Sequence, residues 1–467
     1  MRQDFTSPSV LNLKHLANST PMRMPFAPHR GRLRFTLACA VACALVGADV
    51  HAQVRLPNVQ VPQLPNIQVP VDAGGLVNGA ARTLEPNQLR DLRRLRIREL
   101  LRANRRELES DPNGAPVVRA EIVAYAPSDA ALRMASEAGL TVVRESSLGG
   151  LSVKVVVLRP KSGMSTRAAL RALRRADPEG SYDYNHLYIE SGAIDTSQPV
   201  SPGNGIDTNT GAAKIRVGLI DTGVARDHPS LRGASIEQFG CDSAAAPAAH
   251  GTAVASLLMG HANRFAGAAP DASLYSADVY CGKSTGGSVE AIGAAFSWLV
   301  EKRVPVINVS LVGPPNLLLE KIVGATLARG FIVVAAVGND GPASPPLYPA
   351  AYRGVIGVTG VDAKRRVLME AVRGPQVYFA APGSDMGAAD LQEGYVAVRG
   401  TSFSAPIVAG LLAQRVSEPD VAAAQRAIAA LAAQAIDLGS HGIDKTYGHG
   451  LVGETVRVEA GALLVKK

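Results

Sequence analysis

The sequence has only four cysteines among 467 residues, and it holds no cluster of cysteine and histidine that would predict a metal site. Cys39 and Cys43 lie inside one apolar run, so Cys241 and Cys281 are the pair outside it. An even number of cysteines in an oxidising compartment favours a disulfide, and we expect Cys241 and Cys281 to pair. Two unrelated free thiols are the alternative that the sequence leaves open.

The apolar run at 35–48 is too short to span a bilayer comfortably as a helix, which takes about 20 residues. Arginines at 30, 32 and 34 precede it, and Val50-His51-Ala52 follows it with short side chains where a signal peptidase reads them. This order predicts an N-terminal extension and signal peptide over 1–52. The product would be secreted or periplasmic, with no stable membrane domain. An uncleaved anchor is the alternative.

The formal charge of +8 does not indicate a nucleic-acid partner. Residues 1–210 hold 26 basic and 19 acidic side chains, whereas the chain from 211 onward holds 22 and 21. The basic excess therefore lies in the part that we expect to be removed.

Several enzyme classes lack their motifs in this chain. There is no HExxH sequence, which argues against a zinc hydrolase of that type. Asp221-Thr222-Gly223 fits an aspartic peptidase, but those enzymes need two such carboxylates and no second DTG or DSG occurs. The α/β pattern of strands and helices around Asp221 also differs from the fold expected of an aspartic peptidase.

Two segments precede the region around Asp221. Residues 53–113 combine a proline-rich repeat, LPNVQVP and LPNIQVP, with an arginine- and leucine-rich stretch at 89–108. We interpret the segment as an extended linker and a basic helical segment, more ordinarily solvated than bound to membrane. Residues 114–192 alternate strand and helix patterns in the order β-α-β-β-α-β, with strands from 117, 141, 151 and 181 and helices from 128 and 166.

From residue 193 onward the pattern predicts an α/β domain with a doubly wound, mostly parallel sheet. Short continuous apolar runs suit strands that are buried on both faces, and alanine-rich helices separate them. The strand runs are 215–221, 272–280, 304–311, 331–339 and 354–361, and the helices include 250–260, 288–302 and 401–416. Active groups are expected at the carboxyl ends of such strands.

Three residues at those places suggest chemistry. Asp221 ends a strand, whereas His250 and Ser402 each open a helix. Alone, each is ordinarily a turn, hydrogen-bonding or capping residue. Their chain order of Asp, His and Ser is that of subtilisin among the folds that carry this triad.

Five motifs stand in a known order: DTG at 221, HGTAVA at 250, VGNDG at 337, GTSFSAP at 400 and YGHGLV at 447. With them, residues 213–455 resemble the subtilisin-like serine peptidase (subtilase) family. The resemblance implies a serine endopeptidase in which Ser402 attacks, His250 transfers the proton, Asp221 orients His250 and Asn339 stabilises the oxyanion. A non-catalytic binding module of the same fold is the rival hypothesis, and the presence of all four residues argues against it.

The resemblance also gives 114–192 a role as a ferredoxin-like propeptide that assists folding and inhibits the enzyme. Residues 193–467 would be the catalytic domain. Proteins or peptides would be the substrates, and a monomer is the default expectation. We expect the precursor to cut itself within 192–211, because the last propeptide strand ends near 191 and the next domain begins near 215.

Departures from the family pattern concern specificity and metal. The substrate-binding wall has the sequence Ser310-Leu311-Val312-Gly313, and Leu347 stands where many members have glycine. The added bulk predicts a narrowed pocket that prefers small apolar residues on the acyl side. Ser230 replaces an acidic calcium ligand, so we expect the family's usual high-affinity calcium site to be absent. We expect no cofactor, and calcium bound in another way is the alternative.

Overall fold

The computed structural model describes residues 86–200, 215–243, 246–262, 264–459 and 463. The expected signal peptide and nearly all of the proline-rich linker lie outside the described residues. Within them, none of the helices combines the length and the apolar character needed to cross a bilayer.

The N-terminal part of the described chain confirms the predicted order β-α-β-β-α-β. Its antiparallel sheet has the strand order β5-β2-β4-β3, with β1 added beside β2. Ser128 and Ser165 start the two helices, since each hydroxyl accepts a hydrogen bond from an amide three residues on. The elements are β1 (Leu108–Ser110), β2 (Pro116–Tyr125), α3 (Asp129–Glu137), β3 (Leu140–Leu148), η1 (Gly149–Leu151), β4 (Val153–Pro160), α4 (Thr166–Ala176) and β5 (Ser181–Glu190).

The basic segment before this sheet differs from its prediction at both ends. The helix α2 spans Pro86–Ala103, and Leu108 belongs to β1 rather than to the helix. A turn separates them, in which Asn104 Nδ2 donates to the carbonyl of Leu100. Helical periodicity alone therefore extended the segment too far.

The second part is the predicted α/β domain. Its sheet is parallel throughout, in the order β17-β16-β15-β13-β7-β11-β8. The sheet strands are β7 (Arg216–Asp221), β8 (Ile236–Phe239), β11 (Ser273–Asp278), β13 (Val306–Val309), β15 (Ile332–Ala336), β16 (Ile356–Val361) and β17 (Val377–Pro382). The sequence patterns did not indicate β8 and β17.

Helices cover both faces of this sheet. On one face α5 (Ala249–Met259), α8 (Thr401–Ala413) and α9 (Val421–Ala432) contribute to one apolar core, and on the other α6 (Val289–Glu301) and α7 (Leu317–Ala328) contribute to a second. Short strands complete the domain: β9 (His261–Ala262), β10 (Phe265–Ala266), β12 (Gly287–Ser288), β14 (Leu311–Val312), β18 (Ser384–Ala389) and β19 (Tyr395–Arg399). β6 (Ala193–Val200) pairs with β19.

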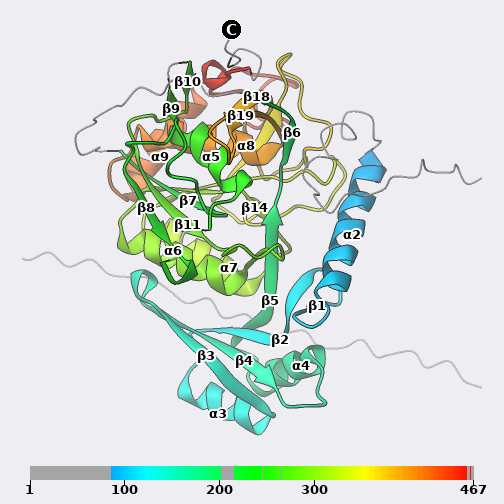
Figure 1. The fold of residues 1–467 in the computed structure, drawn as a ribbon. Helices are drawn as coiled ribbons and strands as arrows, with labels where there is room; N and C mark the ends of the chain where they lie inside the picture. Colours follow the sequence, from blue (N-terminus) through cyan, green and yellow to red (C-terminus); the bar gives the residue numbers. More distant parts are fainter. Residues whose placement is uncertain (1–85, 201–214, 244–245, 263, 460–462, 464–467) are drawn as a thin grey trace, which may run out of the picture. The chain divides into compact units, whose positions relative to one another are not determined.

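The two parts are joined through α6, α7 and the strand β5. Apolar side chains of β2, β4 and β5 belong to the same core as those of α6 and α7. Arg144 of β3 bridges Glu121 of its own sheet and Glu290 in the first turn of α6. β5 then leaves its sheet toward the α/β domain (Figure 1), where it pairs with β12 and β14.

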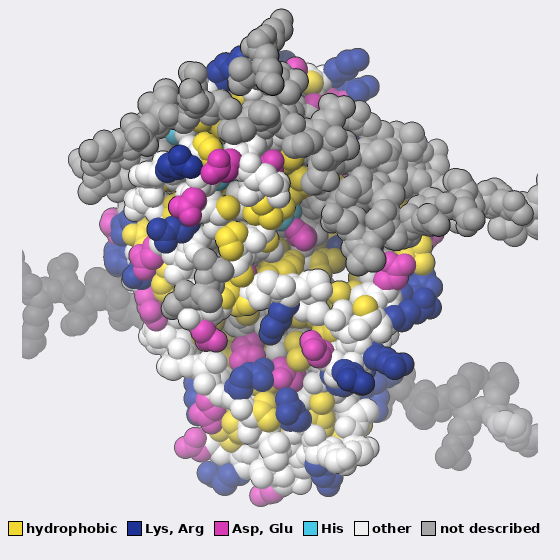
Figure 2. Space-filling model, viewed as in Figure 1, with side chains coloured by type: hydrophobic (Ala, Val, Ile, Leu, Met, Phe, Trp, Pro, Cys, Tyr) yellow, Lys and Arg dark blue, Asp and Glu magenta, His cyan; other side chains and the backbone are white. Residues whose placement is uncertain are grey.

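On the face shown in Figure 2, basic and acidic side chains of the described residues are interspersed over both parts of the chain. This mixture fits the near balance of charges counted from residue 211 onward.

Candidate active site

Asp221 and His250 meet at the carboxyl end of β7. His250 Nδ1 lies 2.8 Å from Asp221 Oδ1, and both side chains are buried. The same oxygen accepts from the amide of Thr222 at 2.7 Å, and the Thr222 hydroxyl accepts from the amide of Gly251 at 2.8 Å. Strand end and helix start are therefore tied together, which fixes the imidazole toward the carboxylate.

Ser402 lies in the first turn of α8 and is fully buried. Pro406 in this helix has no N–H, so the carbonyl of Ser402 lacks its usual helical donor. Ser310 fills the gap, because its hydroxyl donates to that carbonyl at 2.9 Å. In return Ser402 Oγ donates to the carbonyl of Ser310 at 3.2 Å. One residue of the expected substrate wall thus positions the serine.

The contact between the serine and the histidine is not made in this structure. His250 Nε2 is buried and has no hydrogen-bond partner among the described residues. Ser402 Oγ instead lies 2.6 Å from the hydroxyl of Ser191, the residue that directly follows β5. Asp221 and His250 are therefore paired, whereas the hydroxyl of Ser402 contacts the chain's own N-terminal part.

The side-chain amide of Asn339 is oriented by a hydrogen bond to its oxygen atom. Its Oδ1 accepts from the amide of Thr401 at 3.1 Å, which directs Nδ2 toward Ser191. Nδ2 donates to the carbonyl oxygen of Ser191. An amide donor on a carbonyl oxygen beside a serine hydroxyl is the arrangement that stabilises a developing oxyanion.

The carbonyl that Asn339 binds belongs to Ser191, the residue directly after the strand that joins the two parts. Glu190 and Ile189 of β5 pair with Leu311 and Val312 of β14, in antiparallel register. The peptide bond presented to the serine is thus Ser191–Gly192. It lies just before the stretch 192–211 in which we expected cleavage, because strand pairing carries β5 right up to the site.

The residues expected to line the specificity pocket fall into three groups. Ser310 and Leu311 contact the serine and the β5 strand, as described. Val312 and Leu347 pack together with Val372 in a small buried cluster. Gly313 exchanges backbone hydrogen bonds with Tyr348 at 2.9 and 3.1 Å. The two residues whose bulk predicts a narrowed pocket, Val312 and Leu347, therefore lie in one buried cluster.

The electrostatics of His250 depend on two carboxylates. Burial is the largest single influence and lowers the pKa of His250. The charge of Asp221, the charge of Glu190 at 3.7 Å and the hydrogen bond to Asp221 together outweigh burial, so the pKa is raised to about 9. Glu190 is the residue before Ser191 and belongs to β5. Part of the electrostatic field on this histidine thus comes from β5, the strand that leads to Ser191.

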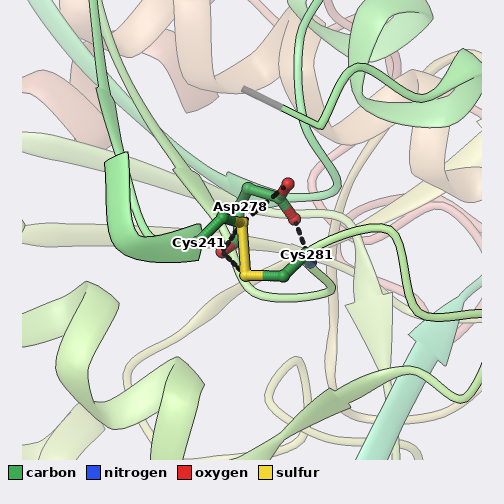
Figure 3. A group of neighbouring side chains, drawn as sticks. All are labelled: Cys241, Asp278 and Cys281. Carbon is green, nitrogen blue, oxygen red and sulfur yellow. Dashed lines mark hydrogen bonds between the residues drawn. A yellow bond between two sulfur atoms is a disulfide. The ribbon is translucent and has the colours of Figure 1, made fainter. Parts of the chain in front are cut away.

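Cys241 and Cys281 are joined by a disulfide, 40 residues apart in sequence (Figure 3). It links the chain just after β8 with the chain just after β11. Asp278, at the end of β11, accepts from the amide of Cys281 at 2.9 Å and pairs in register with Asp221. Burial and the charge of Asp221 raise the pKa of Asp278.

Ser230 stands where the resemblance implies an acidic calcium ligand, and its hydroxyl lies 2.8 Å from His228 Nδ1.

Three residues at the site were missed by the sequence reasoning. Ser191, Glu190 and Asp340 carry no motif of their own. Asp340 follows Asn339 within VGNDG, and this adjacency is the one feature that pointed to it.

Comparison with known proteins finds similar sequences and a similar fold. Residues 212–450 match the family model described as the subtilase family. The chain is 33% identical over 262 residues to subtilisin DY of Bacillus licheniformis, which covers 54% of this chain and 91% of that protein. It is 31% identical over 259 residues to subtilisin E of Bacillus subtilis (strain 168), covering 52% and 67%. The crystal structure of fervidolysin from Fervidobacterium pennivorans is similar in fold, with a TM-score of 0.57, 20% identity and coverage of 75% and 61%.

Proposed function

The chain belongs to the subtilase family and is a serine-type endopeptidase, and from this premise we propose that it is an exported enzyme made as a self-inhibited precursor. Asp221, His250 and Ser402 would form its catalytic triad, with Asn339 as oxyanion donor. The observation that carries the proposal is the Ser191–Gly192 bond between Ser402 and Asn339.

The chemistry follows from these positions. His250 Nε2 takes the proton of Ser402 Oγ, and Oγ attacks the carbonyl carbon of the substrate. The oxygen becomes negative and is held by Asn339 Nδ2. His250 then gives the proton to the leaving nitrogen, the C–N bond breaks, and water hydrolyses the acyl-enzyme. Asp221 holds Nδ1 and stabilises the imidazolium that forms.

In the precursor the first substrate is the chain itself. Ser191 supplies the acyl group and the nitrogen of Gly192 is the leaving group. The N-terminal product keeps the pairing of β5 with β12 and β14, so it stays in the cleft as an inhibitor. Export is supported by the signal-like pattern over 1–52 and by the paired cysteines. We further propose that activity needs no tightly bound calcium.

A fluorophosphonate probe tests this function. The chain is expressed from Gln53, treated with the probe, and both the labelled residue and the masses of all species are determined. We expect the label on Ser402 of a species that begins at Gly192. A correctly folded chain that is neither cut nor labelled would contradict the proposal and would favour the non-catalytic binding module.

The narrowed pocket makes a separate prediction about specificity. Val312 and Leu347 add bulk to the expected pocket wall and pack together, so we expect preferred cleavage after small apolar residues. A peptide library digested with the mature enzyme measures this preference. The matched variant Leu347→Gly should cleave faster after Phe, Tyr or Leu than the unchanged enzyme does. Fast cleavage after these residues by the unchanged enzyme would contradict the narrowed pocket.

A further inference from the structure

The helix α2 contacts the α/β domain through an arginine that pairs with Asp340, the residue after Asn339. Arg93 Nε lies 2.9 Å from Asp340 Oδ2, and its Nη1 donates to Oδ1 at 3.2 Å. One guanidinium thus meets both carboxylate oxygens, the two-point geometry that arginine provides and lysine does not. The side chains keep only 18% and 10% of their exposure, so most of the surrounding water is excluded.

The carboxylate of Asp340 needs such a partner. Burial raises its pKa, while the charge and hydrogen bond of Arg93 and the charge of Arg96 act in the opposite direction. A buried carboxylate without a cation is costly, so removing Arg93 while α2 still covers Asp340 leaves an unfavourable charge. Arg96 also interacts electrostatically with Glu190, on the strand in the cleft.

Apolar contact contributes little to this part of α2. Leu92 and Leu95, on either side of Arg93, remain 37% and 48% exposed. Arg94 is exposed as well and pairs with Asp91 of the same helix at 3.5 Å. The pair of Arg93 with Asp340 therefore contributes a specific polar attachment of α2 to the α/β domain, in addition to the electrostatic interactions of Arg96.

We propose that Asp340 is a binding site for a guanidinium group at the edge of the substrate cleft, and that Arg93 of α2 occupies it in the precursor. Asp340 directly follows Asn339, whose amide binds the carbonyl of Ser191. The contact therefore holds the N-terminal product on the enzyme after the Ser191–Gly192 bond is cut. This inference rests on the proposed self-cleavage. In it, α2 is a second attachment by which the N-terminal product inhibits the enzyme, besides the pairing of β5.

The test compares Arg93→Gln with Arg94→Gln, a change of the same size one residue away. Two rates are followed in the same sample: cleavage of the chain, by gel, and appearance of activity, with a fluorogenic peptide. In Arg93→Gln we expect activity to appear after cleavage at a rate about tenfold higher than in the unchanged chain. The reason is that loss of a largely buried charge pair acts mainly on the rate of dissociation. Arg94→Gln should match the unchanged chain. The mature enzyme lacks both residues, so its kcat/KM serves as an internal standard.

A double-mutant cycle assigns the effect to this contact. With Asp340→Asn in the background, Arg93→Gln should change the release rate by less than twofold. Equal release from the Arg93 and Arg94 variants, or a full effect of Arg93→Gln in the Asp340→Asn background, would overturn the proposal. If the unchanged chain neither cuts itself nor takes the fluorophosphonate label, the proposed function fails instead, and the two failures are distinguished. Fluorophosphonate labelling of each cut variant reports correct folding.

Discussion

The Ser402→Ala chain is expected to remain full length, with no species beginning at Gly192. Without Oγ no acyl-enzyme forms, and neither His250 nor Asn339 can replace the nucleophile. Loss of the serine in subtilisin, a relative of this chain, lowers kcat by about 10⁶, and we take that figure as the expected scale. The measurement is the mass of the purified chain over days, together with peptide hydrolysis after addition of fresh substrate.

Ser404→Ala is the matched control for this variant. Ser404 lies one half-turn further along α8, is also fully buried, and its hydroxyl has no hydrogen-bond partner among the described residues. Its removal should leave self-cleavage intact. Thermal unfolding of both variants separates loss of chemistry from loss of fold, since one buried hydroxyl with a hydrogen bond contributes about 1 kcal/mol. Maturation of pure Ser402→Ala at the unchanged rate would refute a self-catalysed cut.

The candidate catalytic residues could be predicted from the sequence better than the residues of the N-terminal part that contact them. Asp221 ends a continuous apolar strand and His250 opens a helix, and in a parallel sheet these places lie at one edge, so their meeting was predictable. The residues in the cleft were not. Glu190 and Ser191 come to the site because β5 pairs with β14, more than 100 residues away, and pairing between distant strands leaves no local pattern.

The same reason explains the errors in the basic segment. Leucine and arginine recur at helical spacing up to Leu108, so periodicity extended the helix beyond Ala103. What ends it is the turn at Asn104 and the pairing of Leu108 with Val118. Likewise Arg93 looked like a solvated charge, because the acceptor that holds it, Asp340, lies 247 residues away in sequence.

Self-cleavage of the precursor is expected to depend strongly on pH, with a midpoint near the pKa of His250, which Asp221 and Glu190 raise against burial to about 9. The base must be neutral to accept the proton of Ser402, so the rate should rise with pH through this value. At pH 7 about one molecule in a hundred holds neutral His250, given tenfold per pH unit. Cleavage at pH 7 should then be about a hundredfold slower than at its alkaline limit.

Glu190→Gln isolates the part of this effect that the precursor supplies. The carboxylate lies 3.7 Å from His250 Nδ1 and leaves with the N-terminal product, so its removal should move the midpoint of self-cleavage to lower pH. The rate near pH 7 should increase about tenfold for each unit by which the pKa falls. Glu179→Gln, an exposed carboxylate elsewhere in the same part of the chain, is the control.

The mature enzyme completes the comparison, because it contains neither Glu190 nor Glu179. Its profile of peptide hydrolysis against pH should have a lower midpoint than self-cleavage and should be identical for all three chains. Self-cleavage profiles that coincide for Glu190→Gln and the unchanged chain would show that the field on His250 comes from Asp221 alone. A shift confined to the precursor means that the propeptide slows its own removal at neutral pH, through a charge that the active enzyme no longer carries.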